Sequence, residues 1–294
     1  MNKSEPILTD IINKALASIS EDRKEKFSRL NMARSRKVLF DRFDRNNIEF
    51  TLKEKAFLLD NPIITMTGDP NWLPYEGLDA QGHYVGIVPE MLDLFEERLG
   101  VVFKRDIGKS WHESVTMFEQ GQVAMISEIF QSDIGDGTLY SNTYLSSPIV
   151  LVMRDSQQYV SDMQSVANLR LALINDYGYT QRIGDSFPDA TFTHYSDIDA
   201  GLNAVATGKV DVLFATLAQA SFHMASQGMN NLRIVGQTPF SSKLAFGVNK
   251  NNTVLISILN KALLSVSDSE KQAIIARWGS SKFVSHVDYA LDTH

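Results

Sequence analysis

The chain has 294 residues, of which 44% are hydrophobic and 21% are charged, and its formal net charge is -7. This composition suits a globular protein with a packed core, and the acidic balance excludes the basic footprint that nucleic acid or an anionic membrane requires. The chain has no cysteine, which excludes disulfides, thiolate chemistry and cysteine-ligated zinc.

Residues 8–24, near the start of the chain, repeat the pattern of residues 255–271. Both segments place apolar residues on one face of a helix, and both carry an Asn-Lys pair followed by a Ser-x-Ser pattern. Two unrelated amphipathic helices could share the apolar spacing, but that spacing does not require the matched polar residues. We therefore expect residues 1–28 to resemble the C-terminal helix of a preceding, similar domain.

A charged connector follows this segment. Residues 29–60 are predicted to form a linker that ends in a lead-in helix, because Thr51 and Glu54 have the spacing of a capping box and Pro62 lies just beyond the helix. The basic residues of the linker could also suit a nucleic-acid arm, but the interleaved acidic and aromatic residues favour a solvated linker.

Strands and helices alternate along the first half of the main domain. Short apolar runs predict strands, and longer segments with apolar residues three and four positions apart predict helices. In chain order we expect a strand at 63–66, a helix from Pro89 to Gly100, a strand at 101–107, a helix at 110–121 and a strand at 123–127. This βαβαβ order predicts a mainly parallel sheet with helices on its faces.

The same alternation restarts in the second half, where the helix at 196–208 is expected to have Ser196 as its N-cap. We expect strands at 168–176, 210–214, 231–236 and 243–249, and further helices at 217–228, 253–266 and 268–278. Two α/β lobes follow from this order: lobe 1 from residues 61–153 and 242–294, and lobe 2 from residues 154–241. Ligands bind beyond the carboxyl ends of strands in such sheets, so the cleft between the lobes is the predicted binding site.

Several blocks of the sequence resemble the family 3 extracellular solute-binding proteins. The blocks are GDPNWLPYEG with the following YVGIVPEMLDLF, the YSNTYLSSP segment, ATGKVDVLF and the IIARWG ending, and they occur in the family's order. The resemblance implies an α/β, two-lobed clamp of the periplasmic binding protein-like type II fold (a Venus flytrap), with an N-terminal helical extension. The run from residue 231 to 278 is similar to the flytrap sensor domains that stand in tandem in hybrid histidine kinases.

This resemblance implies a periplasmic sensor domain of a membrane-anchored receptor, namely a hybrid histidine kinase of a two-component system. Such a domain binds a small solute between its lobes and signals by lobe closure; it is not itself an enzyme, it needs no cofactor, and its tandem arrangement could support a dimer. The alternatives are a free solute-binding protein of an ABC transporter and a dehydratase-like enzyme on the same fold, which would need paired acid and base groups. The six histidines show no metal-ligand spacing, so no metal is expected.

Lobe 1 offers candidate ligand-binding residues at three places. The loop after the first strand contains Asp69, Trp72 and Tyr75; Trp111 precedes the next helix; and Ser127, Glu128 and Gln131 follow the strand at 123–127. In the resembling family the first loop lines the cleft and places an aromatic side chain under the ligand. Each residue also has a plainer interpretation, because the tryptophans could pack locally and Glu128 could be an exposed strand-end residue.

Lobe 2 offers two further places. Asp176, Tyr177, Gly178 and Thr180 lie where a strand ends and a helix begins, and Thr216 follows the strand at 210–214. Backbone N–H groups at a helix start attract anions, and the matching loop of the family commonly binds a ligand carboxylate. A plain strand-to-helix turn, and a simple helix cap at Thr216, are the alternatives.

Two positions depart from those members of the family that bind amino acids. Asp136 or a neighbour stands where they have an arginine for the ligand carboxylate, and Thr216 stands where they have an aspartate for the ligand amine. Losing both charged partners removes the basis for binding an α-amino acid. We therefore expect a ligand other than a standard α-amino acid.

Overall fold

The computed structural model describes residue 38 and residues 48–129, 137–158, 160, 163–175 and 177–279. The first copy of the repeat and the candidate residues Gln131, Asp136 and Asp176 lie outside the described residues. Among the helices of the described part, none combines the length and the apolar character that crossing a membrane requires.

Helices and strands alternate in the predicted order. The helices are α3 (Leu52–Asp60), α4 (Ile87–Leu99), α5 (Trp111–Glu119), the short 3-10 helix η1 (Gln164–Val166), α6 (Thr180–Ser186), α7 (Ile198–Ala206), α8 (Leu217–Ser226), α9 (Thr253–Ser265) and α10 (Asp268–Trp278). The strands are β1 (Ile63–Thr67), β2 (Asn71–Trp72), β3 (Glu76–Leu78), β4 (Tyr84–Val85), β5 (Val102–Arg105), β6 (Met125–Ile129), β7 (Thr138–Tyr140), β8 (Leu145–Arg154), β9 (Leu171–Ile174), β10 (Phe192–Tyr195), β11 (Val212–Thr216) and β12 (Leu232–Asn249). The short strands β2, β3, β4, β7 and β10 and the long strand β8 were not among the predicted elements.

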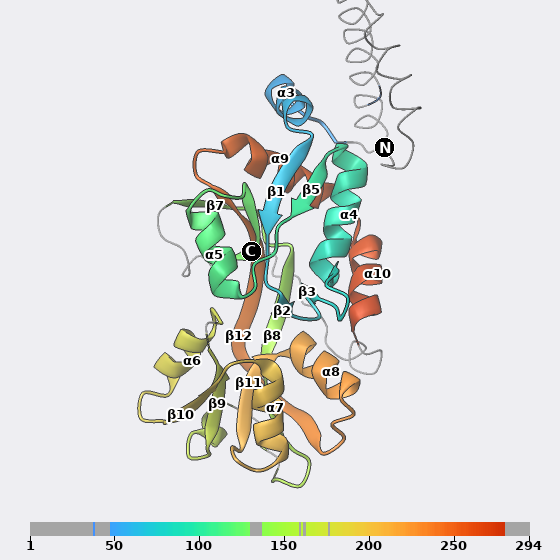
Figure 1. The fold of residues 1–294 in the computed structure, drawn as a ribbon. Helices are drawn as coiled ribbons and strands as arrows, with labels where there is room; N and C mark the ends of the chain where they lie inside the picture. The colour runs from blue at the N-terminus through green and yellow to red at the C-terminus, as the bar shows by residue number, and fades with distance from the viewer. Residues whose placement is uncertain are drawn as a thin grey trace, which may run out of the picture.

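A single path of paired strands passes through both lobes, in the order β10-β9-β11-β8-β12-β6-β1-β5. β1 lies parallel between β5 and β6, and β9 lies parallel between β10 and β11. In Figure 1, lobe 1 is the upper half with α3, α4, α5, α9 and α10, lobe 2 is the lower half with α6, α7 and α8, and the antiparallel pair β8 and β12 joins them. The predicted α/β architecture with mainly parallel sheets flanked by helices is confirmed.

The pairing of the two joining strands shifts in register between Ile234 and Gly236 and again between Gln237 and Ser241 of β12. At that point the hydroxyl of Thr238 donates to the carbonyl oxygen of Ile149 at 2.9 Å. The sequence predicted two separate strands on either side of this point, and that prediction was wrong. β12 is continuous because the interruption is a bulge, which bends a strand without ending it.

The core of lobe 2 begins within β8. Ile149, Leu151 and Met153 belong to one hydrophobic cluster, and Val150 and Val152 belong to a second. Successive side chains of a strand point to opposite faces, so this part of β8 is buried on both sides of the sheet. This part of β8 therefore packs into the core of lobe 2.

The helix α4 covers the sheet of lobe 1. Its side chains Met91, Leu92, Phe95 and Leu99 are buried, as the apolar spacing predicts. The helix ends at Gly100, whose φ of 70° lies in the left-handed region that favours glycine.

Glu54 fixes the lead-in helix α3 to α9. It completes the predicted capping box with Thr51, and its carboxylate accepts hydrogen bonds from Ser257 Oγ at 2.6 Å and Lys261 Nζ at 2.7 Å. Burial by itself would raise the pKa of Glu54, but the bonds from Lys261 and Ser257 outweigh it and lower the pKa to about 2. The lead-in helix is therefore part of lobe 1.

The polar residues shared by the two copies of the repeat make specific contacts in the second copy. Asn260 Oδ1 accepts the N–H of Asn142 at 2.7 Å, Lys261 binds Glu54, Ser265 Oγ accepts from Arg98 at 2.9 Å, and Ser267 forms a capping box with Glu270. Amphipathic packing of a helix uses none of these contacts. The matched residues therefore belong to the architecture of a lobe rather than to helix periodicity.

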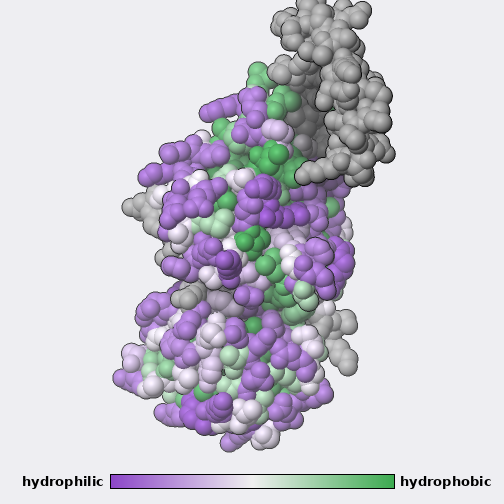
Figure 2. All heavy atoms as spheres, in the orientation of Figure 1, coloured by the Kyte–Doolittle hydropathy of each residue, from purple (hydrophilic) through white to green (hydrophobic). Residues whose placement is uncertain are grey.

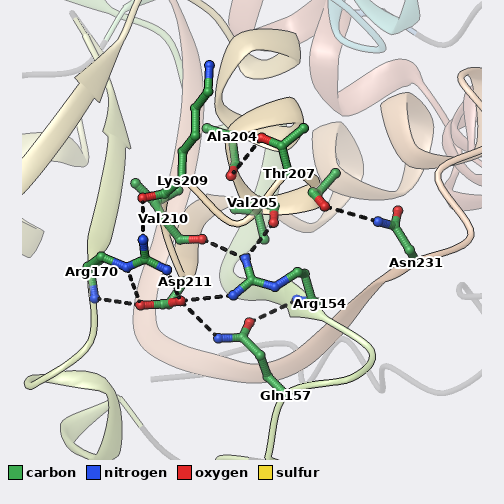
Figure 3. A network of polar contacts seen from close by, with 11 residues as sticks. Arg154, Gln157, Arg170, Ala204, Val205, Thr207, Lys209, Val210, Asp211 and Asn231 are labelled. Carbon is green, nitrogen blue, oxygen red and sulfur yellow. Dashed lines mark hydrogen bonds and ion pairs between the residues drawn. The ribbon is translucent and has the colours of Figure 1, made fainter.

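A polar network closes the far end of lobe 2 (Figure 3). Arg154 donates to the carbonyl oxygens of Val205 and Val210 at 2.7 and 2.8 Å and to Asp211 at 2.9 Å. Arg170 binds both carboxylate oxygens of Asp211 through Nε and Nη2, at 2.8 and 2.7 Å. The bonds from Arg170 and Arg154, set against burial, hold the pKa of Asp211 well below its usual range.

The start of α7 differs from the prediction by one residue. Asp197, rather than Ser196, is the N-cap, because its carboxylate accepts the N–H of Ala200 at 2.8 Å. Ser196 instead donates its hydroxyl to Asp197 at 2.7 Å. A carboxylate at this position also suits the positive end of the helix dipole, which explains why the acidic residue takes the role.

Candidate functional site

The loop after β1 brings the first candidate residues together. A Cβ atom at Gly68 would lie 2.6 Å from Tyr84 Oη and 2.7 Å from Ser127 Oγ, so a larger residue here would displace these polar side chains. Trp72 and Tyr75 follow on the loop, are 1% and 0% exposed, and have ring centroids 4.3 Å apart. The loop thus presents a buried aromatic pair at the carboxyl end of β1.

Glu76 is the polar centre of this region, and the sequence analysis missed it. Its carboxyl group accepts the backbone N–H of Asp69 at 2.6 Å and the hydroxyl of Ser127 at 2.7 Å, and it also accepts the hydroxyl of Tyr84. Burial raises the pKa of Glu76 to about 8 against these bonds, which favour the anion. Glu76 joins β3, β4, β6 and the first loop.

Asp69 is a second buried carboxyl group. Its Oδ1 accepts the N–H of Asn71 at 2.8 Å, and the residue is 7% exposed. Burial raises the pKa of Asp69 to about 6, against the bond from Asn71. A carboxyl group with this pKa is mostly ionised at pH 7 and mostly protonated at pH 5.

Ser127 and Glu128 lie at the carboxyl end of β6, as predicted, and both are buried. The backbone carbonyl of Ser127 accepts the hydroxyl of Tyr144 at 2.9 Å. Burial, and after it the charges of Glu76 and Glu128, raises the pKa of Tyr144. Both carboxyl groups therefore lie near that hydroxyl, and Glu128 belongs with the buried site rather than with the exposed surface.

Lobe 2 contributes Tyr177 through a chain of hydrogen bonds. Thr216 is the N-cap of α8 and accepts the N–H of Gln219 at 3.3 Å, and Gln219 donates its side-chain amide to the hydroxyl of Tyr177 at 3.0 Å. The Tyr177 ring meets Trp72 of lobe 1 edge-on, with centroids 6.1 Å apart. Burial, followed by the charge of Asp69 and then that of Glu128, raises the pKa of Tyr177. The lobes therefore meet at the predicted site.

Two further contacts hold the lobes together. His223 of α8 places Nε2 3.1 Å from the carbonyl oxygen of Leu73, on the first loop of lobe 1. Phe222 packs against Trp278 of α10, with ring centroids 6.3 Å apart. Neither pair was predicted, because the two residues of each pair lie far apart in the sequence and belong to different lobes.

The other candidate residues lie elsewhere or outside the described part. Trp111 packs with Phe118, Val123 and Ile126 in a small cluster of its own, so local packing was the better interpretation of this tryptophan. Thr180 begins α6 and donates its hydroxyl to the carbonyl oxygen of Ile174 at 2.8 Å. Gly178 lies in the turn before α6. Gln131 and Asp176 fall on residues that are not described.

The helix start in lobe 2 gives little support to an anion site. α6 has seven residues, and its N-cap Tyr179 makes no side-chain capping bond. Two acidic residues, Asp69 and Glu128, lie near Tyr177, two residues before that N-cap. Among the described residues, no group of three or more histidine, aspartate or glutamate side chains could hold a metal ion.

Comparison with known proteins gives a family match over most of the described chain. Residues 64–281 match the model of the bacterial extracellular solute-binding proteins, family 3. The chain is 23% identical to the virulence sensor protein BvgS of Bordetella pertussis and 21% identical to the sensor protein EvgS of Escherichia coli K12. Each match covers 79% of this chain and 19% of the relative, so the chain spans about a fifth of the length of these relatives.

The fold is also that of a solved sensor domain. The crystal structure of the periplasmic VFT2 domain of Bordetella pertussis BvgS superposes with a TM-score of 0.72 at 22% sequence identity. The superposition covers 78% of this chain and 99% of that domain. This similarity establishes the two-lobed flytrap fold.

Proposed function

Because this chain belongs to the bacterial extracellular solute-binding proteins of family 3, we propose that it is the extracytoplasmic sensor domain of a membrane receptor and that a small solute binds between its lobes. The contact between Trp72 of lobe 1 and Tyr177 of lobe 2 carries this proposal. It lies at the carboxyl ends of the strands, with buried carboxyl groups beside it, where a clamp of this fold binds its ligand. The domain is a binding module rather than an enzyme.

The receptor is proposed to be a hybrid histidine kinase located in the inner membrane, with this domain in the periplasm. The support comes from BvgS and EvgS, which are sensor proteins and each match over 79% of this chain. A free solute-binding protein of a transporter is the second candidate. The repeat favours the receptor, because tandem flytrap domains are a feature of such sensors.

The repeat also supports a tandem arrangement. Residues 8–24 carry the same polar residues that, in residues 255–271, join elements of lobe 1. At the outer end of lobe 1, near α3, apolar side chains gather on the surface (Figure 2), and Leu52, Ile63 and Val102 are 87%, 59% and 54% exposed. Burying these side chains against a preceding, similar domain would remove apolar area from water.

Signalling is proposed to follow from a change in lobe separation. A ligand shifts the equilibrium between open and closed lobes only if it binds the two states with different affinities. Trp72 of lobe 1 and Tyr177 of lobe 2 contact each other, so the affinity for a solute bound there would depend on the distance between the lobes. The solute is proposed to be other than a standard α-amino acid, since Thr216 is already used as the cap of α8.

The test is a thermal-shift screen of the purified domain with small solutes. A solute that binds the cleft should raise the melting temperature of the native domain, because ligand binding stabilises the folded state. The same solute should lose its effect in Trp72→Ala and in Tyr177→Ala, and keep it in Trp111→Ala, which truncates a tryptophan outside the site. A response that survives in both cleft variants would place the ligand elsewhere and refute the assignment.

A further inference from the structure

We propose that the cleft selects an organic ammonium ion that carries no carboxylate and has an uncharged oxygen acceptor, with Asp69 as the residue that binds the charge. This inference rests on the proposed ligand-binding function of the same cleft and adds the chemical class of the ligand. Four observations support it. Two buried carboxyl groups of lobe 1 lie near Tyr177 of lobe 2, and one of them has no cationic partner among the described residues. The site also has an aromatic surface and a buried N–H donor that has no partner among the described residues.

Asp69 and Glu128 of lobe 1 are buried near Tyr177 of lobe 2. The charges of both act on the hydroxyl of Tyr177, which belongs to lobe 2. Both residues are nearly inaccessible, at 7% and 4% exposure. An anionic ligand between Trp72 and Tyr177 would therefore approach two buried carboxyl groups, which like-charge repulsion disfavours.

Asp69 has no cationic partner among the described residues. Its bonding partner there is the backbone N–H of Asn71, and none of the ion pairs in the described part of the chain includes it. A buried carboxylate is costly unless an opposite charge compensates it. The arginine and lysine side chains of lobe 2 that form ion pairs serve the distant Asp211 network instead. The missing charge is one that a ligand can supply.

The aromatic side chains suit the same ligand. Trp72, Tyr75 and Tyr177 lie against one another, and a cation over the face of such rings is attracted by their negative π surface. The indole Nε1 of Trp72 is buried and has no hydrogen-bond partner among the described residues. Because Trp72 contacts the opposite lobe, this donor is placed to bind an oxygen acceptor of a molecule held between the lobes.

Probes that share one carbon skeleton but differ in charge test which charge class the cleft binds. The probes are phenylalanine, 2-phenylethylamine and 3-phenylpropionate, with the amide phenylalaninamide as the amine that also has an oxygen acceptor. Calorimetric titration of the native domain should show phenylalaninamide binding at least about tenfold more tightly than phenylalanine, and no binding of the acid. A second set, in which ornithine is compared with putrescine and 4-aminobutanamide, has an aliphatic skeleton. It tests the same charge classes if the aromatic probes do not fit the cleft.

Two near-isosteric variants locate the interaction. Asp69→Asn keeps an oxygen to accept the N–H of Asn71, and it should weaken amine binding by about tenfold or more. Trp72→Phe keeps an aromatic ring but removes the donor, so it should weaken the amides more than the simple amines. Trp111→Phe is the matched control and should change neither affinity. A circular dichroism melt of each variant confirms that it is folded.

The pH dependence gives an independent measurement. Because the pKa of Asp69 is raised to about 6, amine affinity should be constant above that pH and fall about tenfold per unit below it, while Asp69→Asn should show a flat profile. If acids or amino acids bind and amines do not, the cation inference is overturned and the ligand-binding function stands. If no charge class binds in either set, both are overturned.

Discussion

The two ring nitrogens of His223, in lobe 2, contact oxygen atoms in different lobes. Its Nε2 lies 3.1 Å from the carbonyl oxygen of Leu73 in lobe 1, and its Nδ1 lies 2.6 Å from Asp199 Oδ1 in lobe 2. The imidazole ring therefore acts as a bridge between α7, α8 and the first loop.

Replacing His223 by alanine should favour the open clamp. A hydrogen bond between uncharged groups contributes about 0.5–1.5 kcal/mol, so the ratio of closed to open molecules should fall by about twofold to tenfold. Small-angle X-ray scattering of the ligand-free domain should show a larger radius of gyration. His83→Ala, at an exposed position, is the matched control, and an unchanged radius in H223A would show that the contact does not hold the lobes.

Replacing Glu54 by glutamine should destabilise lobe 1 by about 1–3 kcal/mol, since a buried carboxylate loses its charge while Lys261 stays beside it. The pKa of Glu54 is lowered from 4.5 to about 2, so its contribution is complete above pH 4.5 and disappears as the pH falls towards 2. Urea denaturation should thus give a difference between the native domain and E54Q that shrinks from pH 6 to pH 3. A difference that is constant with pH would contradict the ion pair.

Glu76 should give the opposite pH dependence. Its pKa is raised from 4.5 to about 8, so the folded state binds a proton that the unfolded state releases between these values. The free energy of unfolding should therefore decrease as the pH rises from 4.5 to 8, by at most about 1.4 kcal/mol per unit. Glu76→Gln keeps an acceptor oxygen and should remove most of this slope in urea denaturation. A slope that persists in E76Q belongs to other groups.

Replacing Asp211 by alanine should cost about 3–5 kcal/mol, because Arg154 is left with a partly buried and uncompensated charge. The loss should appear in chemical denaturation and as faster hydrogen exchange in β8, β9 and β11. The exposed pair Lys104–Asp106 is the control, and Asp106→Ala should cost less than about 1 kcal/mol. Equal losses for both variants would rule out a special role of the network.

The sequence was sufficient to predict those elements whose start, end and buried face depend on neighbouring residues. The capping box of Thr51 and Glu54, the stop at Gly100 and the apolar face of α4 all depend on residues within one helix. Aromatic and acidic residues at strand ends, such as Trp72 and Glu128, were found for the same reason. The order of strands and helices then determined the fold class.

The features that the sequence did not predict depend on contacts between segments that are distant in the chain. Glu76 follows an ordinary loop sequence, and its burial arises only because Ser127, on another strand, donates to it. Two separate strands were expected where β12 is continuous, because the irregular pairing beside Thr238 does not end the strand. His223 and Leu73 come from different lobes and meet only when those lobes close.

Trp278 contacts Glu90 in lobe 1 and Phe222 in lobe 2. Its indole Nε1 donates to Glu90 of α4 at 2.7 Å, which ties it to lobe 1, while its ring lies against Phe222 of lobe 2. If the lobes separate, the first neighbour stays and the second leaves. In a Trp72→Phe, Trp111→Phe double variant of this chain with three tryptophans, the emission of Trp278 would serve as a built-in optical gauge of the clamp.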